Sequence, residues 1–445
     1  MSDSSVQSED SLLRFESVLA VVNQDALIDL AKRLRAEKEA SLDVRATLES
    51  VSISNERFEC KIKSPPICGS YNVVQVIEFS DGVHWILRIP GTGTTDKWTP
   101  DSSRALKSSA RTMQFLKANT TIPLPEVYHY SSSVDNEIGV PYILMSFLEG
   151  KPVYEAWWDE SESQTREERR LRILNSTAEA MSQLAKFQFS QTGSVLFDDT
   201  LTITGIGDCT IPDEWANLRN FSLDVDAGPQ SRTIGPFQNS QDYFLSLLPT
   251  ESTSNDPFSV GIHKLLQMMI RCLPPSIQSL EISTNPIKLE ETFVLHHPDT
   301  DSQNFLVDRD GTLTGILDWD GVHVGPKHIS YQRYPNWVTR DWDPAMYGYD
   351  MEDCRPEDSP ADLEAYRLQY SKAIASLLPH SIDYTSKSHL YEALQIAASN
   401  PICTDSIVEK IFLHLFPSKD DSGEERRWRR DGPTCKDTRG ELGWD

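Results

Sequence analysis

Apolar residues near the start of the chain recur at the spacing of a helix. Between residues 12 and 39, leucine, valine and phenylalanine positions follow one another at intervals near 3.6 and are separated by charged residues. This period is typical of an amphipathic α-helix that turns one face toward a core. The pattern therefore predicts helix within an N-terminal extension over residues 1–50.

The pattern changes to that of β-structure after residue 70. Two runs rich in β-branched and aromatic residues, 73–79 and 83–89, are joined by Ser80-Asp81-Gly82. Such runs around a short Asp-Gly turn predict a β-hairpin. A helical stretch over 102–117, a proline-punctuated segment at 122–127 and a strand-like run over 141–150 follow. The last run is expected to be a buried strand that leads into a linker.

The remainder of the chain is mainly helical in pattern. Residues 166–188 and 263–272 have helical periodicity, while 204–216 and 225–240 are polar connections with glycine and proline that suit substrate-facing loops. From residue 418 onward the composition is that of a polar tail. The resulting division is 1–50, 51–148, 149–417 and 418–445.

Charge excludes one class of partner. The 445 residues contain 42 Lys and Arg against 67 Asp and Glu, a formal net charge of −25. Binding of nucleic acid needs a basic face, so we expect no nucleic-acid partner. A cationic small molecule would suit this balance, although acidity is also an ordinary means of solubility.

Cysteine content and hydropathy bear on the compartment. The seven cysteines are scattered without a CxxC pair, which favours reduced thiols. The first residues lack the basic start and apolar stretch of a signal peptide, and no apolar run is long enough to span a membrane. We therefore expect a cytoplasmic protein that does not interact with membranes.

The segment with the most chemical information is 294–320. Two short apolar runs flank an Asp-Gly turn, and Asn304 and Asp318 each lie seven residues from Gly311. Positions equally far from a hairpin turn face each other, at roughly 4.5–5.5 Å between Cα atoms. An amide oxygen and a carboxylate there could share one hard cation, and oxygen-only ligands favour magnesium over zinc. Asn304 and Asp318 are therefore the candidate metal ligands.

A third oxygen-bearing side chain enters the same loop. Asp299 precedes Asn304 by five residues, where it could orient an attacking hydroxyl and accept its proton. Asp, Asn and Gly are also common turn residues, so a lone Asp would signify only loop chemistry. The combination of all three groups through one hairpin favours an active site, with Asp299 as the catalytic residue.

This segment resembles the aminoglycoside phosphotransferase-like family of the protein kinase-like superfamily, and its fungal members in particular. The family loop has the form H-x-D-x-x-x-x-N followed by a strand and a metal-binding Asp, which His297-Pro298-Asp299 to Asn304 and then Ile316-Leu317-Asp318-Trp319 match. The resemblance implies a bilobal α+β kinase-like fold, with a five-stranded antiparallel sheet and a helix near 51–146 and a larger, mainly helical lobe. It also implies Asp299 as base, Asn304 and Asp318 as magnesium ligands, and His297 as a loop scaffold.

The resemblance extends over about residues 65–350. Gly69 and Ser70 before the hairpin look like the loop that covers the nucleotide, and the Ser146-Phe147-Leu148 segment looks like the hinge that contacts adenine. The strand position that usually holds a phosphate-binding Lys is Arg88, and the helix Glu that pairs with it is replaced by Ser109. The implied cofactors are ATP and Mg²⁺.

Four functions remain open from the sequence. The first is an ATP- and magnesium-dependent phosphotransferase that acts on a hydroxyl of a small molecule, since no long activation segment for a protein substrate is present. The second is a nucleotide-binding protein that no longer phosphorylates, because of Arg88 and Ser109, and a related alternative is a kinase fold used for another transfer reaction. A metal-dependent hydrolase using His296, His297, Asp299 and Asp301 is the least favoured.

Overall fold

The chain folds as two compact units in a computed structural model. The structure describes residues 12–43, 58–160, 164–223, 230–249, 256–275, 291–349, 351 and 356–416. The first unit comprises residues up to Asn119 together with Leu124–Glu149, and the second comprises Thr120–Pro123 together with the chain from Gly150 onward. The predicted tail from 418, and residues 1–11 and 44–50 of the predicted extension, lie outside the described residues.

The first unit contains an antiparallel sheet. Its strands have the order β1-β3-β4-β6-β5, and β2 pairs with β3 beside this path. The expectation of five strands was wrong by one, because β2 is a two-residue strand, too short to have a hydrophobic pattern of its own. The strands are β1 (Cys60–Ile62), β2 (Ile67–Cys68), β3 (Asn72–Phe79), β4 (His84–Pro90), β5 (Val127–Ser131) and β6 (Tyr142–Ser146).

The predicted hairpin at the centre of this sheet is confirmed. Strands β3 and β4 pair from Asn72 opposite Pro90 to Glu78 opposite His84. Every second side chain of both strands is buried, as expected for a sheet with one face in a core. Trp85 and Leu87 lie in that core, so Arg88, the next residue on β4, is on the opposite face.

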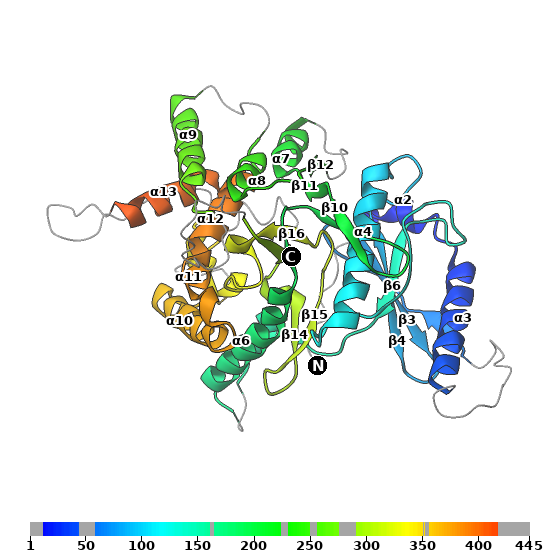
Figure 1. Cartoon of the computed structure of the whole chain (residues 1–445). Helices are drawn as coiled ribbons and strands as arrows, with labels where there is room; N and C mark the ends of the chain where they lie inside the picture. The colour runs from blue at the N-terminus through cyan, green and yellow to red at the C-terminus, as the bar shows by residue number, and fades with distance from the viewer. Residues whose placement is uncertain are drawn as a thin grey trace. The chain divides into compact units, whose positions relative to one another are not determined.

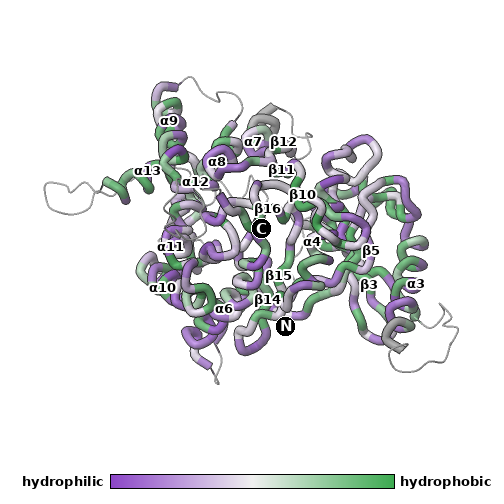
Figure 2. Tube along the Cα trace, viewed as in Figure 1, coloured by the Kyte–Doolittle hydropathy of each residue, from purple (hydrophilic) through white to green (hydrophobic). Residues whose placement is uncertain are grey.

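Two helices, rather than one, cover the buried face of the sheet. Helix α2 (Glu16–Leu19) and helix α3 (Gln24–Asp43) contribute Val18, Leu27 and Leu30 to the core (Figure 1). The two helices are separate because the Asn23 side chain accepts a hydrogen bond from the Ala26 amide (3.1 Å), which starts a new helix at that point. That bond forms a local cap that the hydrophobic period does not reveal. Apolar and polar positions alternate along α3 (Figure 2).

Helix α4 (Pro100–Asn119) extends the helix expected at 102–117 by a few residues at each end. Its buried side chains include Leu106, Met113 and Leu116, and Ser109 lies among them. Figure 1 shows α4 and α3 on opposite sides of the sheet.

The second unit combines helices with small antiparallel sheets. Apolar residues of the helices, among them Leu266, Ile270, Ile407 and Val408, form a common core. Its elements up to the last long loop are β7 (Lys151–Pro152), α5 (Val153–Ala156), α6 (Arg166–Ser182), η2 (Gln183–Lys186), β8 (Gln188–Phe189), β9 (Ser194–Phe197), β10 (Ile203–Gly207), β11 (Cys209–Pro212), α7 (Glu214–Leu223), β12 (Ser231–Ile234), α8 (Ser240–Ser246) and α9 (Pro257–Arg271).

The strands that matter for chemistry lie in the last part of the second unit. They are β13 (Phe293–His296), β14 (Phe305–Val307), β15 (Leu313–Ile316) and β16 (His323–Pro326), accompanied by η3 (Ser302–Asn304), η4 (Lys327–Ile329), η5 (Asn336–Val338) and η6 (Arg340–Trp342). The helices that follow are α10 (Pro360–Leu377), η7 (Pro379–Ser381), α11 (Ile382–Thr385), α12 (Ser388–Ser399) and α13 (Thr404–Leu415). An antiparallel sheet in one unit and a mainly helical second unit confirm the predicted α+β, bilobal kinase-like fold class.

None of the helices in the described part of the chain has both the length and the apolar character that a membrane crossing requires.

Candidate active site

The loop with the predicted chemistry connects two small sheets of the second unit. Strand β13 pairs with β16 and β8, while β14 pairs with β15 and β7. Residues 297–304 therefore start and end at paired strands, and all four residues of β13 are buried. A short loop whose two ends are both continuous with paired strands has a more rigid backbone than an ordinary surface loop.

His297 connects this loop to the segment before Asp318. Its Nδ1 accepts a hydrogen bond from the Asp299 amide (3.2 Å), and its Nε2 donates to the carbonyl oxygen of Leu317 (2.9 Å). Burial is the main cause that lowers the pKa of His297, to about 4, so the ring is neutral and can both accept and donate. His297 thus occupies the place of a scaffold residue, in line with the sequence-based expectation.

Asp299 and Asn304 are brought together. The Asn304 side chain donates through Nδ2 to Asp299 Oδ2 (2.8 Å), and Asp299 Oδ1 accepts from the Asp301 amide (2.9 Å). Each carboxylate oxygen of Asp299 therefore has a fixed donor, which sets the orientation of the whole group. Asn304 itself is buried at the end of η3, a short turn whose first amide is capped by the Asp301 side chain (2.6 Å).

The electrostatic environment favours proton uptake by Asp299. Burial raises the pKa of its carboxyl group, the nearby charge of Asp301 raises the pKa further, and the charge of Asp318 adds to the same effect. A hydrogen bond from the Asp301 amide and the charge of Arg333 act in the opposite direction. A carboxylate with a raised pKa is a stronger base than an ordinary aspartate, as general base catalysis near neutral pH requires.

The predicted pairing of Asn304 with Asp318 was wrong by one residue. Phe305 faces Ile316, and the Leu317 amide donates to the Asn304 carbonyl oxygen (2.7 Å), so Leu317 is the residue opposite Asn304. The turn is centred on Asp310 rather than Gly311, since Val307 faces Leu313, and a bulge at Thr314 recovers one of the two displaced positions. The cause is Asp308, whose side chain accepts from the amides of Asp310 and Thr312 (2.9 Å each).

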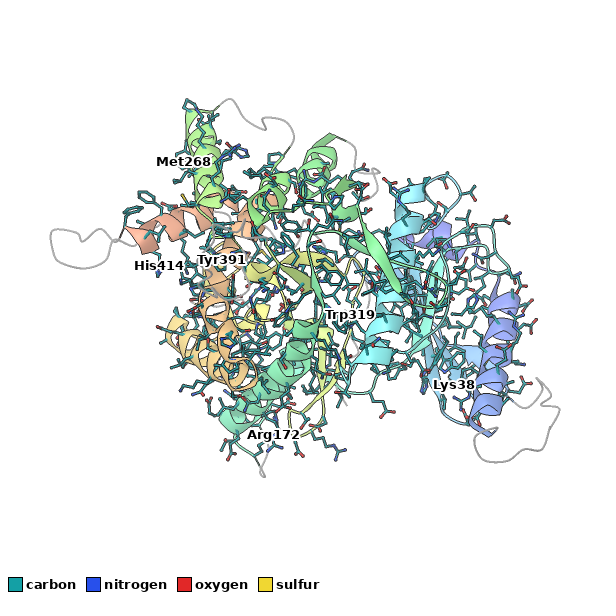
Figure 3. All side chains as sticks on the ribbon, in the orientation of Figure 1. Lys38, Arg172, Met268, Trp319, Tyr391 and His414 are labelled. Atoms are coloured by element: carbon teal, nitrogen blue, oxygen red, sulfur yellow. The ribbon has the colours of Figure 1, made fainter. Side chains whose placement is uncertain are left out.

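Asp318 nevertheless follows directly after that contact. It has a φ of 55°, a left-handed conformation that Asp tolerates better than most residues and that ends the extended course of β15. The next residue, Trp319, is buried beneath the loop, and its indole nitrogen donates to the Ile316 carbonyl oxygen (2.9 Å); it is labelled in Figure 3. Its ring lies edge-on to the His297 ring, with 4.6 Å between centroids. Asp318 itself is exposed.

The oxygen atoms in this loop suit a hard cation. Because Asn304 Nδ2 donates to Asp299, its oxygen Oδ1 is the amide atom left for a ligand role, and the carboxylate of Asp318 is exposed. In the described part of the chain, no group of three or more His, Cys, Asp or Glu side chains could hold a metal ion. A cation here would therefore need ligands from elsewhere, such as phosphate oxygens and water, as magnesium commonly has. His296, His297, Asp299 and Asp301, all described residues, therefore do not form the metal-binding cluster that the hydrolase alternative requires.

The nucleotide-binding residues expected from the resemblance lie in the first unit. Gly69 and Ser70 form an exposed turn between β2 and β3, in which the Gly69 amide donates to the Asn72 carbonyl oxygen (2.9 Å). The Arg14 side chain, from the segment before α2, donates to the Ser70 carbonyl oxygen (3.2 Å). Arg88 lies opposite Val74 and Ile143 in the sheet, half-buried, and Ser109 is 3% exposed in α4.

The expected adenine-contacting segment begins at the end of β6. The amides of Ser146 and Phe147 are already bonded, to the carbonyl oxygens of Glu126 (2.9 Å) and His84 (3.3 Å). The Ser146 hydroxyl accepts from the Glu126 amide (2.9 Å), and the Phe147 ring is exposed. Among the described residues, the Leu148 amide donates no backbone hydrogen bond. Of these three amides, Leu148 is therefore the one left to bind a base.

Two residues that contact the catalytic loop were missed from the sequence. Arg333 donates through Nη2 to the His297 carbonyl oxygen (3.2 Å), and the Asn336 amide donates to the Thr300 carbonyl oxygen (3.1 Å). Both lie more than 30 residues further along the chain, in a segment without secondary-structure periodicity. No spacing motif in the sequence indicates that Arg333 and Asn336 contact this loop.

Comparisons with known proteins identify the family of this chain. The model of the phosphotransferase enzyme family (APH) matches residues 69–343, more than half of the chain, and this range contains the whole loop. A subtelomeric hrmA-associated cluster protein of Aspergillus fumigatus is 30% identical over 322 residues, which is 61% of this chain and 60% of that protein. The mitochondrial protein called altered inheritance of mitochondria protein 9 from Lachancea thermotolerans is 22% identical over 83% of this chain and 62% of its own length.

The chain thus spans about three fifths of the length of these curated relatives. Among solved structures, a macrolide 2'-phosphotransferase from Brachybacterium faecium aligns with 85% of this chain and 98% of its own, with 12% identity and a TM-score of 0.37. A likeness at that level assigns no substrate.

Proposed function

Since the chain belongs to the phosphotransferase enzyme family, we propose that it transfers the γ-phosphoryl group of ATP, with magnesium, to a hydroxyl group of a small molecule. The observation that carries the proposal is the arrangement of Asp299 in its loop. The carboxylate is mostly buried, each oxygen is held by a donor at 2.8–2.9 Å, and the pKa is raised by burial. A residue that only forms a turn does not require this combination of burial, two hydrogen-bonded oxygens and a raised pKa.

In the proposed reaction Asp299 accepts the proton of the acceptor hydroxyl. The acceptor oxygen forms a bond to the γ-phosphorus as the bond from that phosphorus to the β–γ bridging oxygen breaks, and ADP leaves with the electron pair. Asn304 fixes Asp299 Oδ2, and the Asp301 amide fixes Oδ1, so the base needs no reorganisation at the moment of transfer.

The remaining roles are assigned by the same proposal. Asn304 Oδ1 and Asp318 would hold magnesium, which when bound supplies neutralisation of negative charge on the phosphate oxygens. Gly69, Ser70 and Arg88 would contact phosphates, and the segment Ser146–Leu148 would contact adenine through the Leu148 amide. The acidic chain suits a cationic acceptor, and a cytoplasmic location remains the expectation from sequence.

The direct test is a screen of the full chain with magnesium-ATP against a library of small alcohols, sugars and amino alcohols. The proposal predicts ADP formation together with one compound that gains the mass of a phosphoryl group. If calorimetry shows magnesium-dependent ATP binding and no acceptor or water ever yields ADP, the second function, a nucleotide-binding protein without transfer activity, is supported instead.

Arg88 separates these two functions. A guanidinium that contacts phosphate contributes a charge-assisted hydrogen bond, so Arg88→Ala is expected to weaken ATP affinity by about 10-fold or more. Arg88→Lys should retain part of that affinity because the charge is kept. Calorimetry with magnesium-ATP measures both, and an unchanged affinity of Arg88→Ala would remove the phosphate role.

Ser109 provides a further check on Arg88. Because Ser109 is buried in α4, Ser109→Glu places a carboxylate in the protein interior, which is costly unless a cation meets it. If Arg88 lies within reach, Ser109→Glu should lower the melting temperature less in the natural chain than in the Arg88→Ala variant. Equal losses in both backgrounds would show that Arg88 does not meet this position.

A further inference from the structure

The catalytic loop is held by a second segment, residues 330–343, which we call the brace. Three hydrogen bonds join the two segments: Arg333 Nη2 to the His297 carbonyl oxygen, the Asn336 amide to the Thr300 carbonyl oxygen, and the Thr300 hydroxyl to Asn336 Oδ1. The first two act on the backbone on either side of Asp299. The position of the proposed base therefore depends on the position of the brace.

The brace is in turn anchored to two long helices of the second unit. The Tyr334 amide donates to the Ser388 hydroxyl at the start of α12 (3.0 Å), and its phenol bonds with Ser371 of α10 (2.7 Å). From α10, Arg367 donates to the Val338 carbonyl oxygen (2.8 Å) and to both carboxylate oxygens of Asp341 (2.6 and 3.2 Å). The position of the brace is thus set by α10 and α12, two helices with buried side chains that do not contribute residues to the 297–304 loop.

Arg333 differs from an ordinary structural arginine in its partners. It is 4% exposed, and the nearest carboxylate, Glu392 of α12, lies 3.7 Å from Nη1, beyond hydrogen-bond distance. Neither Arg333 Nε nor Glu392 Oε1 has a hydrogen-bond partner in the described part of the chain, whereas Glu392 Oε2 accepts from the Thr339 hydroxyl (2.9 Å). The Arg333 guanidinium therefore donates its hydrogen bond to the His297 carbonyl oxygen, while the nearby Glu392 carboxylate compensates its charge.

Burying a guanidinium has a large desolvation free energy. A well-packed apolar residue in its place would often stabilise the fold as well or better. Among the described residues, the one hydrogen bond from the Arg333 side chain goes to the His297 carbonyl oxygen, two residues before Asp299. We propose that Arg333, with its charge compensated by Glu392, is a positioning residue that holds the catalytic loop so that Asp299 keeps its orientation. The inference rests on the proposed function only in taking Asp299 as the base.

The test compares Arg333→Lys and Arg333→Ala with the control Arg35→Lys in the full chain. Arg35 is a partly buried arginine of helix α3 that donates to Asp81 Oδ2 (2.9 Å), outside both the brace and the catalytic loop. For ATP turnover with water or an identified acceptor, Arg333→Ala is expected to lower kcat by about 10²-fold, because small displacements of a base are costly. The KM for ATP should change little, since Arg333 has no proposed nucleotide contact.

Two further measurements keep the outcome decisive. Guanidinium ion added to Arg333→Ala should restore part of kcat. Amide hydrogen exchange over residues 297–304 should be faster in both Arg333 variants than in the natural chain or Arg35→Lys. Unchanged exchange in this loop, or the same loss of kcat in Arg35→Lys, would overturn the positioning role. If Arg333→Ala fails to fold, Arg333→Lys and Glu392→Gln give the same comparison.

Hydrogen exchange also separates the two proposals. A natural chain that binds ATP and never forms ADP contradicts the proposed function, while faster exchange of the loop in the Arg333 variants would still support the brace.

Discussion

Asp299→Asn is expected to lower kcat by about 10²-fold or more and to leave nucleotide affinity nearly unchanged. The amide has almost the shape of the carboxylate, so the loop can keep its backbone bonds, but it cannot accept the proton of the acceptor hydroxyl. Steady-state turnover with the identified acceptor measures the first quantity, and calorimetry with magnesium-ATP measures the second.

Two matched changes test the assignment to Asp299. Asp310→Asn makes the same substitution at the exposed turn of the β14–β15 hairpin and should have no effect on kcat. Asp301→Asn should cost less than Asp299→Asn, because the Asp301 side chain is engaged with the amide and hydroxyl of Ser302 and an amide oxygen can replace it there. If Asp301→Asn were the more damaging of the two, Asp301 would be the better candidate for the base.

Asp318→Ala should instead weaken the magnesium-dependent part of nucleotide binding, by about 10-fold or more, because it removes one of the two proposed protein ligands of the ion. Titration of ATP in the presence and absence of magnesium separates this part from contacts to the base and the sugar. The natural chain is expected to bind ATP more tightly with magnesium, and the variant should lose most of that difference.

Asp310→Ala is the control for this experiment, since it removes a carboxylate from the far end of the same hairpin. Its magnesium dependence should equal that of the natural chain. Equal magnesium dependence in Asp318→Ala and the natural chain would contradict the role of Asp318 as a ligand.

Local sequence was a good guide wherever neighbouring residues decide the structure. The β3–β4 hairpin was predicted correctly because alternating burial and a short turn are encoded within 19 residues. The contact of Asp299 with Asn304 also lies within one short loop, and the spacing of five residues brings the two side chains together. The break between α2 and α3 was missed because it depends on one capping side chain, Asn23, within a continuous hydrophobic period.

The register at Asn304 shows where such reasoning fails. Counting from Gly311 assumes a symmetrical turn, whereas the turn that forms is set by the two amides bonded to Asp308 and by a bulge at Thr314. The turn type and the bulge are both backbone conformations that sequences of very similar composition can adopt. Residue types alone therefore do not predict which of them forms. As a result Leu317, not Asp318, faces Asn304, and Asp318 is oriented by its left-handed backbone.

The sequence by itself determined the family, the fold class and the identity of the loop residues that carry the proposed chemistry, because these depend on short motifs and on periodicity. The tertiary structure alone decided how that loop is held. The contact of Arg333 with His297 joins residues 36 positions apart, and Glu392 comes from a helix still further along the chain. An arginine's residue type indicates that it can donate to a carbonyl oxygen, but which carbonyl it meets is fixed only when helices α10 and α12 pack and place the brace beside the loop.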